Sequence, residues 1–139
     1  MTVACKRIQI STHGHGEMLN VTSEIAREVN NSGLNSGTVT VFIPGSTAGV
    51  TTIEFEPGLI KDIKKLGERL APSEAEYAHN ETWGDGNGFS HIRAAVIGPS
   101  LTVPFNDKKL LLGTWQQIVI IDHDNRSRTR DVAVQLIGD

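Results

Sequence analysis

Residues 101–121 read LTVPFNDKKLLLGTWQQIVII, and this stretch decides the fold class that the sequence predicts. Its first five residues are mostly apolar or β-branched, Asn106-Asp107 is typical of a turn, and Leu110–Ile121 is apolar on both faces with few exceptions. We therefore predict two antiparallel strands. A strand that is apolar on both faces needs two covering layers, which favours either a sandwich-like arrangement or burial against another subunit.

Strand patterns continue on both sides of this stretch. A turn around Asp124-Asn125 leads into a last strand at Arg128–Ile137. Upstream, residues 38–43 and 49–55 are β-branched and strand-like, and a Pro-Gly-Ser turn separates them. Residues 3–11 alternate apolar and polar positions and predict an opening strand.

Three amphipathic helices are expected between these strands. Thr22 is a candidate N-cap for the first, Pro57 suits the first turn of the second, and Asn87 is a candidate N-cap for the third, which stops at Gly98-Pro99. Apolar residues at three- and four-residue steps predict the buried stripe of the second helix, formed by Leu59, Ile63, Leu66 and Leu70.

No linker, internal repeat or low-complexity segment divides the 139 residues. A chain of this length can bury one substantial core. We therefore predict a single α+β domain over residues 1–139, with a mostly antiparallel, sandwich-like sheet and about three helices.

Composition excludes several classes of function. A net charge of −3 and a pI near 5.9 argue against nonspecific nucleic-acid binding. Cys5 is the single cysteine, so an intramolecular disulfide and a CxxC motif are both excluded, as fits a reducing compartment. No signal-peptide pattern or membrane-spanning apolar run is present, and we predict a cytoplasmic protein without membrane partners.

The chemistry-bearing residues concentrate in Tyr77–Arg93, which reads YAHNETWGDGNGFSHIR. His79 and His91 lie twelve residues apart with Asp85 between them, and the glycines around Asp85 allow backbone turns that bring side chains together. Imidazole and carboxylate groups can form a metal or catalytic site, but the same residues also suit a polar surface loop.

The helix start at Asn87-Gly88 is a candidate anion site, because unpaired N–H groups and the helix dipole favour phosphate or carboxylate there. No Walker motif or complete GxGxxG pattern accompanies it, so a nucleotide fold is not supported.

Other polar groups have two interpretations each. The alternating arginines Arg126, Arg128 and Arg130 share one face of a strand, and they fit either a small anion site or a solvated edge strand. His13 and His15 can bind a metal together or lie in a flexible loop.

Several motifs in this order resemble one family throughout. They are GSTAGVTTIE (45–54), His79, GNGFSHIRAAVIGPSLTVPF (86–105), GTWQQIV (113–119) and the closing arginine-rich hairpin. The chain is similar to the YjbQ-like family, whose members are described as secondary thiamine-phosphate synthases or as uncharacterised. The resemblance implies a homotrimer of compact α/β subunits, with a polar, metal-binding pocket near a subunit interface.

One departure from the family pattern concerns the pocket. Family members commonly carry His-Thr-Thr-Ala-Gly where this chain has Gly45-Ser46-Thr47-Ala48-Gly49. The remaining candidate ligands for a divalent ion such as Zn²⁺ or Mg²⁺ are the two imidazoles of the central stretch and one carboxylate. They are His79 and His91 with Glu54, Asp62 or Asp85.

The resemblance implies an enzyme that joins an aminopyrimidine pyrophosphate to a thiazole phosphate and releases pyrophosphate. The residues expected to carry catalysis are His79, His91, Glu54 and Gln116, with His79, His91 and Asp85 as metal ligands and Asn87, Gly88 and Thr47 at the phosphate groups. Two alternatives remain: a metal-dependent hydrolase with Glu54 or Asp85 as general base, and a non-catalytic trimer that binds a small phosphorylated metabolite.

Overall fold

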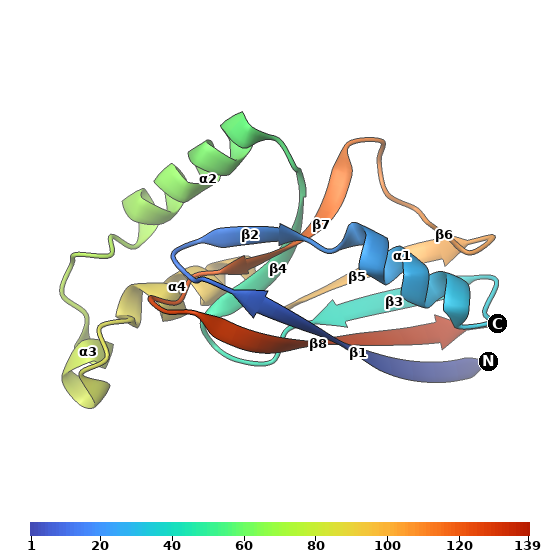
Figure 1. Ribbon diagram of the computed structural model, residues 1–139, viewed down its shortest axis with the longest axis horizontal. Coiled ribbons are helices and arrows are strands. Elements are labelled where there is room, and N and C mark those ends of the chain that lie inside the picture. Colours follow the sequence, from blue (N-terminus) through green and yellow to red (C-terminus); the bar gives the residue numbers. More distant parts are fainter.

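The computed structural model describes residues 1–139 and contains eight strands and four helices (Figure 1). In chain order they are β1 (Thr2–Thr12), β2 (Glu17–Asn20), α1 (Thr22–Asn31), β3 (Gly37–Phe42), β4 (Ala48–Glu54), α2 (Pro57–Leu70), α3 (Ala78–Trp83), α4 (Gly88–Ile97), β5 (Ser100–Asn106), β6 (Lys109–Leu110), β7 (Gln116–Asp122) and β8 (Arg128–Gly138).

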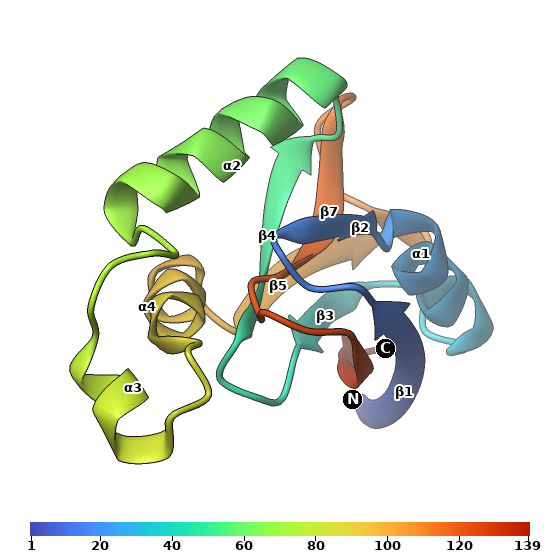
Figure 2. The same cartoon turned by 60° about the vertical axis from the view of Figure 1, so that its left-hand side comes forward.

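The strands form two sheets in which every paired strand is antiparallel. The larger sheet has the order β1-β8-β3-β5-β6, and the smaller has the order β2-β7-β4. Figures 1 and 2 place α2, α3 and α4 at one end of the molecule and α1 at the other. The predicted α+β class with mostly antiparallel sheet is confirmed.

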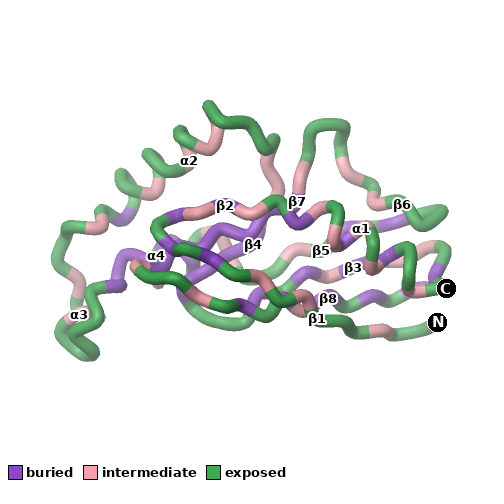
Figure 3. The backbone as a smooth tube through the Cα atoms, in the orientation of Figure 1, coloured by how far each residue is buried: buried purple, intermediate pink, exposed green.

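The main core lies between the two sheets and under α1. Strand β8 turns Val132, Val134 and Leu136 inward at alternate positions, and all three are buried against residues such as Ile118 of β7 and Ile25 of α1. Burying each of these side chains contributes roughly 1.5–3 kcal/mol. Figure 3 shows the buried residues along the strands and the exposed residues along α2.

The expected strand Leu110–Ile121 is wrong in its extent but correct in its two-sided burial. Residues 111–115 form a loop, and only Gln116–Asp122 is the strand β7. The side chain of Gln116 closes this loop, because its Oε1 accepts the N–H of Gly113 at 3.0 Å. Ile118 and Ile120 then face the main core, whereas Val119 and Ile121 face a second cluster with Met18.

Helix α2 begins at Pro57, as expected, but its predicted stripe is only partly correct. Ile60 and Ile63 pack against the second cluster, whereas Leu66 and Leu70 remain 59% and 50% exposed. The sheet beneath α2 has only three strands. It therefore packs against the first half of the helix, whereas Leu66 and Leu70 in the second half face solvent.

Two other helix predictions need correction. Thr22 is the first residue of α1 and does not cap it, because its hydroxyl accepts the N–H of Ile118 at 2.8 Å instead. The short helix α3 was not expected, since six residues are too few to display a helical period. None of the four helices is long and apolar enough to cross a membrane.

Candidate functional site

The structure brings His79 and His91 into contact. Their ring centroids lie 4.2 Å apart with a tilt of 41°. His79 belongs to α3 and His91 to the first turn of α4. The two helices lie close because Gly84 and Gly86 take positive φ angles, +71° and +69°, that reverse the chain between them.

The two histidines line a polar cavity of about 340 Å³. Its walls come from the turn before β4, the α3–α4 segment and the start of β8. The lining residues are Gly45, Ser46, Thr47, His79, Trp83, Asp85, Asn87, His91, Arg128 and Arg130.

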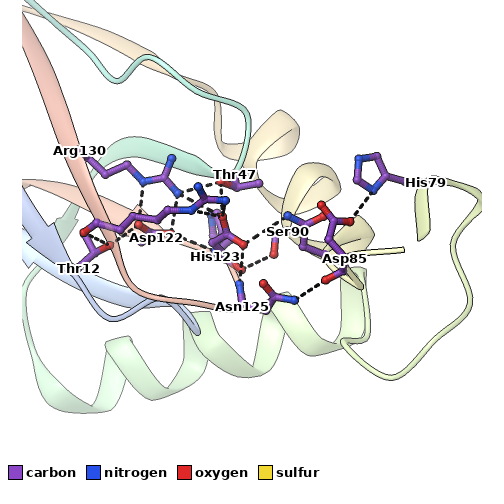
Figure 4. Close-up of polar contacts among 12 residues, drawn as sticks. Thr12, Thr47, His79, Asp85, Ser90, Asp122, His123, Asn125 and Arg130 are labelled. Carbon is purple, nitrogen blue, oxygen red and sulfur yellow. Dashed lines mark hydrogen bonds and ion pairs between the residues drawn. The ribbon is translucent and has the colours of Figure 1, made fainter. Parts of the chain in front are cut away.

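Arg128 and Arg130 line this cavity and are each paired with a buried aspartate. Figure 4 shows the pair of Arg130 with Asp122 and the neighbouring Thr47. Arg130 binds Asp122 through Nε and Nη2 at 2.8 and 2.9 Å, and Nη2 also donates to the Thr47 hydroxyl at 2.8 Å. Arg128 binds Asp124 through Nε and Nη2 at 2.8 and 2.7 Å. Because both carboxylates are fully buried, the two guanidinium groups are held in fixed orientations.

Hydrogen bonding keeps both aspartates ionised in spite of their burial. Burial alone would raise the pKa of Asp122, but hydrogen bonds from Arg130 and Thr12 outweigh it, so this pKa is lowered. The pKa of Asp124 is also lowered, because hydrogen bonds from the Asn125 backbone and the Arg128 side chain outweigh burial.

Each arginine retains donors that its aspartate does not use. The Nη1 atoms of Arg128 and Arg130 make no hydrogen bond within the chain. A Cβ added at Gly45 would lie 3.0 Å from Arg130 Nη1, so the glycine leaves this atom open toward the cavity. Arg126 precedes β8 and is exposed, so the three arginines do not share one strand face as predicted. Strand β8 lies between β1 and β3, and the interpretation as a solvated edge strand is therefore also wrong.

The histidine side of the cavity contains polar atoms without partners. His79 Nδ1 lies 3.9 Å from Asp85 Oδ1, which is too far for a hydrogen bond, and Asn87 Oδ1 is also unpaired. Burial, followed by the neighbouring His79, lowers the pKa of His91. The His91 imidazole is therefore neutral at pH 7.

The helix start at Asn87-Gly88 is not an open anion site, contrary to the sequence-based prediction. The Gly88 N–H donates to Asn80 Oδ1 at 2.9 Å. Asn87 is the N-cap residue, but its side chain makes no capping bond and instead donates to Asp124 at 3.4 Å. The Gly88 N–H and the Asn87 side-chain amide are thus used inside the protein.

Glu54 and Gln116 do not join the histidines within one chain. They pair with each other at one end of the β4–β7 ladder, whereas Ala48 and Asp122 pair at the end near the cavity. Six residues of strand separate the two ends by about 20 Å. Gln116 lines a different groove and donates to the Thr52 hydroxyl at 2.9 Å.

The structure contains no group of three or more His, Cys, Asp or Glu side chains that could hold a metal ion. Two touching imidazoles and a more distant Asp85 do not form a complete ligand set within one chain. Asp62 lies exposed on α2, and His13 is exposed with Glu17 Oε2 at 2.6 Å from its Nδ1. The residues of the single chain therefore do not fit the predicted divalent ion.

The aspartates of this cavity were missed, although the sequence carries a signal for them. Asp122 and Asp124 alternate just before the last turn, and Arg128 and Arg130 alternate just after it. Strands β7 and β8 belong to different sheets, so the expected hairpin between them is wrong. The short connection nevertheless keeps the opposite charges close in sequence, and they form ion pairs.

Comparisons with known proteins agree on one family. The family model of the UPF0047 protein YjbQ-like family matches residues 6–139. A UPF0047 protein of Methanothermobacter thermautotrophicus is 33% identical over 99% of this chain and 94% of its own length. The UPF0047 protein YugU of Bacillus subtilis is 31% identical over 96% of this chain and 98% of its own length.

Solved structures give the same result for the fold. A YbjQ-like protein of unknown function from Sulfolobus solfataricus has a TM-score of 0.94 at 28% identity and covers 99% of both chains. A hypothetical protein from Aeropyrum pernix has a TM-score of 0.90 at 29% identity, over 98% of this chain and 99% of the other.

Proposed function

Because the chain belongs to the YjbQ-like UPF0047 family, we propose that it is a transferase similar to a secondary thiamine-phosphate synthase. In this reaction the ring nitrogen of a thiazole phosphate forms a bond to the methylene carbon of an aminopyrimidine pyrophosphate. The bond between that carbon and the pyrophosphate oxygen breaks, and pyrophosphate leaves with the electron pair.

The observation that supports this proposal is the pair of anchored arginines facing the histidines across one cavity. A guanidinium group matches the geometry of phosphate oxygens. Both Arg128 and Arg130 line the cavity, and the free Nη1 of Arg130 lies beside Gly45, another lining residue. Asp122 and Asp124 hold these donors in place before a ligand arrives. Donors fixed in advance stabilise the charge that develops on a leaving pyrophosphate.

The two histidines would contact the ligand from the other side. His91 is neutral at pH 7 and can accept a hydrogen bond from a substrate amine. His79 Nδ1 and Asn87 Oδ1, which lack partners in the protein, supply two more points of attachment. A cavity of about 340 Å³ is at the small end of the range for small-molecule sites, as suits one phosphorylated heterocycle.

The proposed reaction involves no metal ion, because the single chain does not bring three candidate ligands together. The homotrimer implied by the family resemblance is part of the proposal. Since Glu54 and Gln116 lie about 20 Å from the histidines along β4 and β7, they could act at such a cavity only across a subunit boundary.

The test is to incubate the protein with both precursors and to measure thiamine phosphate by mass spectrometry and pyrophosphate by an enzymatic assay. We expect both products in equal amounts, with loss of at least tenfold in rate for His79→Ala and for Arg128→Gln. His13→Ala is the matched control, because His13 is exposed and lies outside the cavity. No condensation by protein supplied with Mg²⁺ or Zn²⁺ would reject the transferase.

A non-catalytic binder of a phosphorylated metabolite is the second candidate, and Gly45 favours it. This glycine stands where the family commonly has a histidine, so the cavity offers space beside Arg130 in place of a third imidazole. A binder would be stabilised against heat by a phosphorylated precursor without turnover. Arg128→Gln would then abolish the stabilisation, and His13→Ala would retain it.

A further inference from the structure

We propose that a second, smaller cavity between α2, α4 and the end of β7 binds a small carboxylate with a short apolar chain. The cavity has a volume of about 100 Å³ and shares no lining residue with the histidine–arginine cavity. Its polar lining includes Lys64, Glu68, Arg93 and His123. The proposal is independent of the transferase activity.

Two buried side chains present unused hydrogen-bonding groups at this cavity. Arg93 is 8% exposed, and its Nε and Nη2 atoms bind the Ala71 carbonyl and the Glu68 carboxylate at 2.8–3.1 Å, while Nη1 has no partner. His123 is 6% exposed, and its buried Nε2 has no partner. A buried polar group without a partner is costly, so a ligand that satisfies these atoms is favoured.

A glycine in the middle of α2 makes room for the Arg93 guanidinium. A Cβ added at Gly67 would lie 3.2 Å from Arg93 Nη1. Glycine inside a helix is unfavourable relative to alanine. The absence of a side chain at Gly67 therefore leaves room beside the unpaired Nη1 atom of Arg93.

The charges around this cavity favour an anion. Arg93 is paired with Glu68 at 2.9 Å, whereas Lys64 forms no ion pair and leaves one positive charge in excess. Burial, followed by the charge of Arg93, lowers the pKa of His123 to about 4. The His123 imidazole is thus neutral at pH 7 and adds a hydrogen bond without repelling Lys64 or Arg93 through charge.

Size and apolar lining narrow the ligand to one chemical class. Met18, Ile63 and Ile121 supply the apolar part of the lining and pack together in the second cluster. A volume of about 100 Å³ is smaller than the cavity of roughly 150 Å³ that holds benzene in another protein, so a nucleotide or sugar phosphate is excluded. A monocarboxylate with two to four carbons, such as propionate, matches both surfaces.

Binding is tested by titrating the protein with acetate, propionate, butyrate and inorganic phosphate at constant ionic strength and pH 7. We expect saturable shifts of the His123 ring and Arg93 side-chain resonances in NMR spectra, with propionate or butyrate bound more tightly than acetate. Failure of all carboxylates to saturate at millimolar concentration would overturn the proposal. Phosphate bound as tightly as propionate would also overturn it, since phosphate has no apolar part.

Two variants and one control variant separate specific binding from general attraction of anions. Gly67→Ala places a methyl group beside Arg93 Nη1 and should abolish binding, while the circular dichroism of the helices is retained. Lys64→Gln should weaken propionate at least fivefold, and Lys65→Gln on the same helix, outside the cavity, should not. Equal weakening by both lysine variants, or undiminished binding by Gly67→Ala, would reject the site.

Discussion

At the scale of single residues, His123 makes the stability of the protein depend on pH below neutrality. Burial and then Arg93 lower its pKa from 6.5 to about 4. The unfolded chain therefore takes up a proton first as the pH falls below 6.5, and the folded state loses stability until about pH 4. A pKa lowered from 6.5 to about 4 corresponds to a loss of about 3 kcal/mol in the free energy of unfolding.

This loss is measured as the free energy of unfolding in urea at several pH values between 7 and 4.5. We expect a steady decline in the natural protein, a much flatter profile for His123→Leu, and an unchanged slope for the exposed-site control His13→Ala. The pKa values of Asp122 and Asp124 are lowered from 3.8, so their contribution is lost only below that pH and does not overlap this window. A flat profile in the natural protein would contradict the assignment.

Single-residue chemistry was only partly predictable from sequence. His79, Asp85 and His91 were found because histidines and an acid cluster around turn glycines, and the structure places all three at one cavity. The burial of Arg130 against Asp122 could not be predicted, because an arginine in a strand pattern suits solvent as well as an ion pair. The Gly88 N–H is already bonded to the side chain of Asn80, eight residues earlier in the chain. No local sequence pattern indicates this bond.

At the scale of elements, α1 and α2 differ in how deeply their apolar side chains are buried against the sheets. Ile25 of α1 is fully buried in the main core, whereas Leu66 of α2 is mostly exposed. We expect Ile25→Ala to lower the free energy of unfolding by about 2–5 kcal/mol and Leu66→Ala by less than about 1 kcal/mol. Chemical denaturation measures both, and similar losses would show that α2 is covered in solution.

The presence of the strands was predicted more accurately than the residues at which they begin and end. The period of two identified β3 and β8, because alternate residues face one buried side. β-Branched composition identified β4, whose burial does not alternate. Apolar composition alone extended β7 back to Leu110, since a loop with Leu111, Leu112 and Trp115 looks like a buried strand in sequence. Leu112 packs against the main core, whereas Leu111 and Trp115 are mostly exposed in the single chain.

At the scale of the whole molecule, exposed apolar side chains support the proposed homotrimer. Trp115 is 72% exposed, and Leu111 of the same loop is mostly exposed. Large exposed apolar groups commonly mark protein interfaces. We expect light scattering to give the trimer mass at micromolar concentration, and Trp115→Lys to give smaller species with unchanged circular dichroism.

Tryptophan fluorescence adds a second readout of assembly. If the loop around Trp115 is buried between subunits, a soluble quencher should reach it less in the natural protein than in a dissociated sample. Trp83→Phe removes the other tryptophan, so that the signal reports Trp115 alone. A monomer mass for the natural protein would remove the interface, and with it any role for Gln116 at a shared cavity.

The pairing of β1 with β8 has a consequence for how the protein is made. Thr2 pairs with Gly138 and Thr12 with Arg128, so every rung of this ladder joins residues more than a hundred positions apart. Strand β8 also lies between β1 and β3, and the larger sheet cannot close until β8 leaves the ribosome. At a synthesis rate of about 5–20 residues per second, β1 waits several seconds for its only partner. Closing so long a loop is slow even afterwards, and during this time the apolar side of β1 is open to chaperones or to wrong partners.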